Sequence, residues 1–89
     1  MITENVTIVN KLGLHARAAS KLVNCASQFE SEVFITRKGN RVNAKSIMGV
    51  MMLAASMGVE VALEVEGNDE QTCRDALILL INDRFGENE

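Results

Sequence analysis

The chain has 89 residues, of which 47% are hydrophobic and 24% charged, and its formal net charge is −3. This length fits one domain with a single core that uses nearly every apolar face, so a functional site should be shallow and lie at the surface. The acidic balance, the scattered basic residues and the lack of aromatic stacking platforms argue against nucleic-acid binding. No stretch reaches the roughly 18 to 20 apolar residues of a membrane helix, which argues against membrane insertion. The first residues also lack the order of a signal peptide, so we expect a cytoplasmic protein.

The spacing of apolar residues predicts seven elements in the order βαββαβα. The expected elements are a strand over 2–9, a helix from 16 to about 28, a hairpin over 32–43, a short helix over 46–53, a strand over 60–66, and a last helix that begins at Asn68 or Asp69. Gln71 is expected to cap that helix, and residues 86–89 are expected to fray.

The strand over 60–66 alternates valine and leucine with glutamate, which predicts a sheet with one face in water. Placing all helices on the other face buries every apolar stripe. We therefore expect one α+β domain over residues 1–89, a two-layer open-faced sandwich. It should have a four-stranded antiparallel sheet with three helices on one face.

The two cysteines, Cys25 and Cys73, have neither a paired motif nor a histidine at metal-ligand spacing. Both fall on apolar faces of expected helices, where a free cysteine packs as a small hydrophobe. The sequence therefore favours reduced thiols over a redox or metal site. We expect no bound metal and no cofactor.

Residues 13–17 carry the most chemical content, because here the first strand turns into the first helix. The first N–H groups of a helix, Ala16 among them, lack intrahelical partners, and the helix dipole adds positive charge that favours phosphate. His15, at or beside the N-cap, would lie next to that anion as a neutral nucleophile. Arg17, and Lys21 one turn further on, would offer positive charge to the phosphoryl oxygens. Spacing alone favours a plainer alternative, in which His15 only satisfies the helix end and the basic residues form a solvated face.

Two runs of sequence resemble a known family. The run LGLHARAA over 12–19 looks like the active-centre signature of HPr, the histidine-containing phosphocarrier of the bacterial phosphotransferase system, and KSIMGVM over 45–51 resembles its regulatory-serine segment. The resemblance implies that enzyme I, charged by phosphoenolpyruvate, phosphorylates Nδ1 of His15. His15 would then pass the group to an enzyme IIA domain, with Arg17 stabilising the phosphate. Ala18 stands where the family usually has proline, and since alanine is an excellent helix former, the helix should survive.

The second run suggests a regulatory site and a docking surface. Sequence alone favours a plain N-cap for Ser46, and the resemblance adds phosphorylation of Ser46 by HPr kinase/phosphorylase. The apolar residues that follow are read as core from sequence alone, whereas the resemblance makes them a surface shared by donor and acceptor. The residues expected to bind partners are Ser20, Lys21, Asn24, Ile47, Met48, Gly49, Met51 and Met52.

Three interpretations stay open. The leading one is a monomeric phosphocarrier for sugar uptake, not an enzyme, whose transient partners are enzyme I, enzyme IIA domains and HPr kinase/phosphorylase. A carrier of the nitrogen-related branch, or a regulator that depends chiefly on Ser46, would differ only in partners. A non-phosphorylated regulatory α+β domain would carry no acid-labile phosphate on His15.

Overall fold

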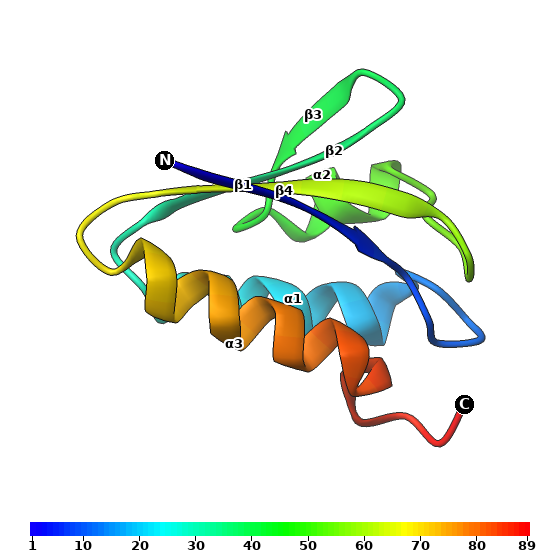
Figure 1. Ribbon diagram of the computed structural model, residues 1–89. Helices are drawn as coiled ribbons and strands as arrows, with labels where there is room; N and C mark the ends of the chain where they lie inside the picture. The colour runs from blue at the N-terminus through cyan, green and yellow to red at the C-terminus, as the bar shows by residue number, and fades with distance from the viewer.

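The computed structural model describes all residues, 1–89, in two layers (Figure 1). The strands are β1 (Ile2–Thr7), β2 (Glu32–Arg37), β3 (Asn40–Asn43) and β4 (Glu60–Glu66). The helices are α1 (Ala16–Ser27), α2 (Ile47–Met52) and α3 (Glu70–Asn82), followed by the 3-10 turn η1 (Arg84–Gly86). The sheet has the order β1-β4-β2-β3, and every neighbouring pair is antiparallel. The expected α+β fold and its βαββαβα order are confirmed.

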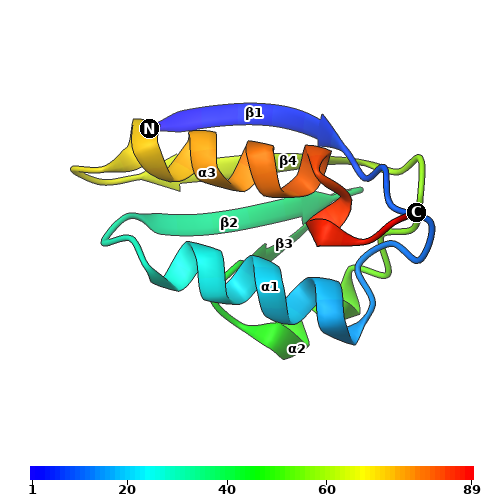
Figure 2. The same ribbon diagram turned by 90° about the horizontal axis from the view of Figure 1, so that it is seen from below.

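One core lies between the sheet and the helices. In β4 the side chains of Val61, Leu63 and Val65 are buried, and the register places Val6 of β1 opposite Val61 and Ile35 of β2 opposite Leu63. In Figure 2, α1 and α3 lie side by side across this face, with α2 next to α1. Because successive strand residues face opposite sides, the glutamates at both ends of β4 stay exposed. No helix combines the length and the apolar character needed to cross a membrane.

Both cysteines are free thiols on the inner sides of helices. Cys73 is fully buried and Cys25 is half-buried against the core. Burial raises the pKa of both thiols, and for Cys73 the Asp69 carboxylate contributes as well, bringing its pKa to about 11. A thiol with so high a pKa stays protonated and inert at neutral pH, as the packing interpretation predicted.

The start of α3 differs in detail from expectation. The N-cap residue is Asp69, as expected, but Gln71 makes no capping hydrogen bond. Instead Glu70 Oε1 accepts from the backbone N–H of Gly67, just before the helix, at 3.2 Å. The Asp69 carboxylate accepts from the backbone N–H of Glu30 at 2.9 Å and of Ser31 at 3.0 Å, and from the Ser31 hydroxyl. These hydrogen bonds, with that of the Ser31 hydroxyl the strongest, lower the pKa of Asp69. The carboxylate thereby ties the start of α3 to the connection between α1 and β2.

The expectation that residues 86–89 fray is wrong. Arg84 and Phe85 both adopt the left-handed conformation, with φ of 57° and 54°, which reverses the chain after α3. The Phe85 side chain is fully buried in the core, and Lys21 Nζ donates to the Phe85 carbonyl at 2.6 Å. Lys11 N donates to the carbonyl of Glu89, so the tail is fixed beside the loop that leads into α1 (Figure 2).

Candidate functional site

The loop that carries His15 is held against the connection between α2 and β4. His15 is the N-cap residue of α1, as its sequence position predicted. Two residues earlier, Gly13 adopts φ +67°, and an added Cβ there would lie 2.5 Å from the carbonyl oxygen of Ala55. Leu14 N donates to that same oxygen at 2.9 Å. Glycine is therefore required both for the conformation and for the close approach.

The N-terminus of α1 is open. The His15 side chain makes no capping hydrogen bond, and the first helical bond runs from Ala19 N to the His15 carbonyl at 2.8 Å. The N–H groups of Ala16, Arg17 and Ala18 have no backbone acceptor. Three unpaired donors and the positive end of the helix dipole meet beside the imidazole, which is an arrangement that binds anions.

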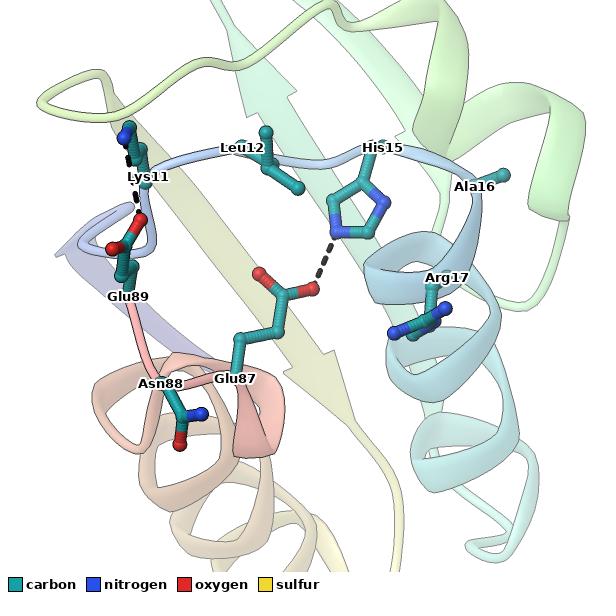
Figure 3. A pocket seen from close by; sticks show the side chains of 8 residues that line it. All are labelled: Lys11, Leu12, His15, Ala16, Arg17, Glu87, Asn88 and Glu89. Carbon is teal, nitrogen blue, oxygen red and sulfur yellow. Dashed lines mark hydrogen bonds and ion pairs between the residues drawn. The ribbon is translucent and has the colours of Figure 1, made fainter.

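His15 lines an open pocket of about 710 Å³ between the start of α1 and the C-terminal tail (Figure 3). The lining residues are Lys11, Leu12, His15, Ala16, Arg17, Glu87, Asn88 and Glu89. Arg17 is exposed and takes part in none of the ion pairs of the structure. Its guanidinium is therefore available to an anion in this pocket. Lys21, expected to assist it, directs its ammonium to the Phe85 carbonyl instead.

The tail brings a carboxylate to the histidine. Glu87 Oε2 is hydrogen-bonded to His15 Nε2, and Glu87 Oε1 accepts from Asn10 Nδ2 at 3.0 Å (Figure 3). The buried Asn10 also donates to the Gly13 carbonyl at 2.8 Å, which links the carboxylate to the active loop. The other ring nitrogen of His15 points away from Glu87, toward the start of α1 (Figure 3).

The charge on Glu87 follows from these contacts. Burial works to raise the pKa of Glu87, but hydrogen bonds from Asn10 and His15 and the charges of His15 and Lys21 outweigh it and lower that pKa. Glu87 is therefore a carboxylate at neutral pH, and a carboxylate only accepts hydrogen bonds. It follows that a proton lies on Nε2, which leaves Nδ1 as the nitrogen that carries the lone pair whenever the ring is neutral.

The surface of α2 is apolar. Val50 is fully buried, whereas the four outer side chains are exposed: Ile47 to 42%, Met48 to 70%, Met51 to 38% and Met52 to 77%. Core packing is therefore excluded for these four. Ser46 is the N-cap residue, and its hydroxyl accepts from Gly49 N at 3.2 Å. The other residues expected to bind partners lie on the adjacent α1, where Lys21 and Asn24 are exposed and Ser20 is half-buried.

Comparison with known proteins agrees with this geometry. Residues 2–83 match the family model described as "PTS HPr component phosphorylation site". The chain belongs to the HPr family. The phosphocarrier protein HPr of Cupriavidus necator is 57% identical over 89 residues, with 100% of each chain covered. A crystal structure of HPr-C-His from Thermoanaerobacter tengcongensis covers 100% of both chains at 45% identity, with a TM-score of 0.96. A second structure from that organism, described as an HPr dimer, is 46% identical, covers 98% of this chain and 100% of the other, and has a TM-score of 0.79.

Several features of this HPr site bear on the sequence predictions. Ala18 is fully buried in the first turn of α1, and the helix begins at Ala16, as expected for an alanine at this position. The sequence did not predict the roles of Asn10, Phe85 and Glu87. Their contacts join residues far apart in the chain, and the contact of Glu87 with His15 spans 72 residues. Phe85 was the one usable signal, since a large aromatic residue after the last helix is rarely left in water.

Proposed function

We propose that this chain accepts a phosphoryl group on Nδ1 of His15 and passes it on to another protein. The observation that carries the proposal is the position of His15 as the N-cap of an open helix, in a pocket shared with the unpaired Arg17. The Nδ1 lone pair attacks the phosphorus, and the nitrogen–phosphorus bond forms as the bond to the donor breaks. Such a transfer needs positioning and charge neutralisation more than covalent assistance.

The phosphoryl oxygens are held by α1. The N–H of Ala16, with those of Arg17 and Ala18, supplies donors, and the Arg17 guanidinium supplies charge. A proline at position 18 would have no N–H, so Ala18 adds a donor that relatives with the usual proline lack. The free energy of the reaction comes from the donor, because the donor's bond to phosphorus is the one that breaks as the nitrogen–phosphorus bond forms.

The partners follow from the surface and from the family. Enzyme I, charged by phosphoenolpyruvate, is the donor, and enzyme IIA domains are the acceptors, in sugar uptake and its regulation in the cytoplasm. We propose that the donor and the acceptor bind in turn to one surface over α1 and α2. This surface is made of Ser20, Lys21, Asn24, Ile47, Met48, Gly49, Met51 and Met52. A carrier must leave one partner to reach the next, which favours a small, transient interface and a monomer.

The test is intact mass after incubation with enzyme I, phosphoenolpyruvate and Mg²⁺. The parent should gain one phosphoryl group, about 80 Da, that is lost in acid, whereas a His15→Ala variant should gain nothing. Ser27→Ala, an exposed change on the same helix but outside the proposed docking surface, serves as the control that keeps His15. If parent and His15→Ala gain no mass with several active enzyme I preparations, the regulatory-domain alternative is the better account.

A second function is favoured by the place of Ser46. Its hydroxyl is the N-cap of α2, directly before the exposed apolar side chains of that helix. A phosphate on Ser46 adds about −1.5 to −2 charges beside this surface, which should weaken acceptance from enzyme I. HPr kinase/phosphorylase should label the parent and not Ser46→Ala. Equal labelling of both would remove Ser46 from the regulation.

A further inference from the structure

The Glu87 carboxylate is the one acidic group that touches the imidazole of His15. Both side chains are largely shielded from water, with 28% of His15 and 14% of Glu87 exposed. A carboxylate so close to a site for phosphate needs a reason, because two negative groups repel each other. The reason lies in the two ring nitrogens, since Glu87 binds Nε2 and leaves Nδ1 free (Figure 3).

We infer that Glu87 is a positioning residue for phosphoryl transfer, which holds a proton on Nε2 of His15 while the phosphoryl group enters and leaves through Nδ1. This inference rests on the function proposed above and goes beyond it in assigning a role to the C-terminal tail. The hydrogen bond fixes the neutral tautomer with a lone pair on Nδ1 and orients the ring toward α1.

The balance of atoms and charge explains why a proton on Nε2 favours phosphoryl transfer through Nδ1. When Nδ1 attacks phosphorus, the ring keeps its Nε2 proton and becomes a phosphorylated imidazolium with one positive ring charge, which the Glu87 carboxylate neutralises. In the onward step the Nδ1–phosphorus bond breaks, its electron pair returns to Nδ1, and neutral imidazole leaves. Without the Nε2 proton the leaving group would be an imidazolate anion, which is a far poorer leaving group.

The structure holds Glu87 in this place from three sides. Asn10 Nδ2 donates to its second oxygen at 3.0 Å, the Phe85 side chain anchors the chain two residues earlier, and Lys21 Nζ binds the Phe85 carbonyl at 2.6 Å. The other charged groups that face the pair are Lys11, Arg17 and Glu89, of which Lys11 and Glu89 form an exposed ion pair at 3.3 Å. Only Glu87 is directed at the ring, so its loss is not compensated.

The experiment compares Glu87→Ala with Glu89→Ala in the full chain. Both changes remove one carboxylate from the same tail, but only the first removes the contact with His15. Each protein is phosphorylated by enzyme I, and protonation of Nε2 in phospho-His15 is followed by ¹⁵N NMR against pH. Transfer to an enzyme IIA domain is timed over the same range.

In Glu87→Ala the pH midpoint for loss of the Nε2 proton should fall by about one unit, the low end for an adjacent opposite charge because the pair is partly exposed. Only the fraction with a protonated Nε2 transfers its phosphoryl group. Above the parent's midpoint the transfer rate of Glu87→Ala should therefore be up to about tenfold below that of the parent, whereas below the variant's midpoint the two rates should be equal. Glu89→Ala removes a carboxylate that lines the pocket without contacting the ring, so its midpoint should shift far less than that of Glu87→Ala. A variant that merely loosened the tail would be slower at every pH.

Each outcome can be assigned. If the parent carries no phosphate on His15, the proposed function fails and the inference with it. If the parent is phosphorylated but Glu87→Ala has the parent's midpoint and rates, the inference alone is overturned. Should Glu87→Ala unfold, Glu87→Gln removes the charge at nearly constant volume, and the same shift is expected because one amide oxygen cannot serve both Asn10 and His15.

Discussion

Replacing Gly13 by alanine should uncouple the active loop from the body of the protein. The residue adopts φ +67°, which costs an alanine about 1–2 kcal/mol. The new Cβ would also lie 2.5 Å from the Ala55 carbonyl oxygen and 2.7 Å from Ser56 Cα. These are backbone atoms that cannot rotate away, so the loop must move and weaken the 2.9 Å hydrogen bond from Leu14 N, a further loss of about 1 kcal/mol.

The expected total is about 2–3 kcal/mol, a large share of the roughly 4 to 13 kcal/mol typical for a chain of this length. Urea unfolding measures it, and Gly58→Ala is the matched control. Gly58 has φ +88° with nothing within 4 Å of an added Cβ, so it incurs only the conformational cost. The phosphorylation rate of His15 should fall in Gly13→Ala and not in Gly58→Ala. Equal unfolding free energies for the two variants, within about 0.5 kcal/mol, would refute the close-approach argument.

Three further changes test other parts of the account. Arg17→Ala should slow phosphoryl transfer at least about tenfold. The unfolding free energy should stay within about 0.5 kcal/mol of the parent's, since the side chain is exposed and unpaired. Unchanged transfer rates in rapid-quench assays would remove Arg17 from the mechanism. Phe85→Ala should lower the unfolding free energy by about 3–5 kcal/mol in urea and expose the tail to proteolysis, because its ring is fully buried; a loss below about 1 kcal/mol would contradict this. The pKa of Asp69 is lower in the folded state than its ordinary 3.8, so its stabilisation is present above that value and is lost as pH falls through the lowered one. Thermal unfolding of Asp69→Asn should therefore show a deficit at pH 7 that disappears in strong acid, and a deficit constant with pH would exclude the ionic contribution.

The sequence predicted those features that depend on local order. Helices and strands follow from apolar spacing, and His15 lies at a helix start because residues 13–17 themselves encode the turn into α1. The exposure of Met48 and Met52 was predictable in part, since a helix of six residues cannot bury every apolar side chain. Element order then determined the layers, because only one face of the sheet was apolar.

The C-terminal contribution was not predictable from local order. The residues after Phe85 are small, polar or acidic, and such a terminus ordinarily frays. Its fixed path depends on two left-handed residues, on a buried ring, and on hydrogen bonds to Asn10 and Lys21. Both hydrogen bonds join positions more than 60 apart in sequence. Pairing across such distances is decided by the packed tertiary structure, and a single sequence carries no periodic signal for it.

The central claim is that His15 carries a phosphoryl group from one protein to another, and onward transfer tests it most directly. The phosphorylated protein, separated from enzyme I and phosphoenolpyruvate, would be mixed with an unphosphorylated enzyme IIA domain and both intact masses followed in time. The account predicts that this chain loses about 80 Da as the acceptor gains the same mass, at a rate far above that of hydrolysis alone. Phosphate that stays on His15, or that is released only to water, would contradict it.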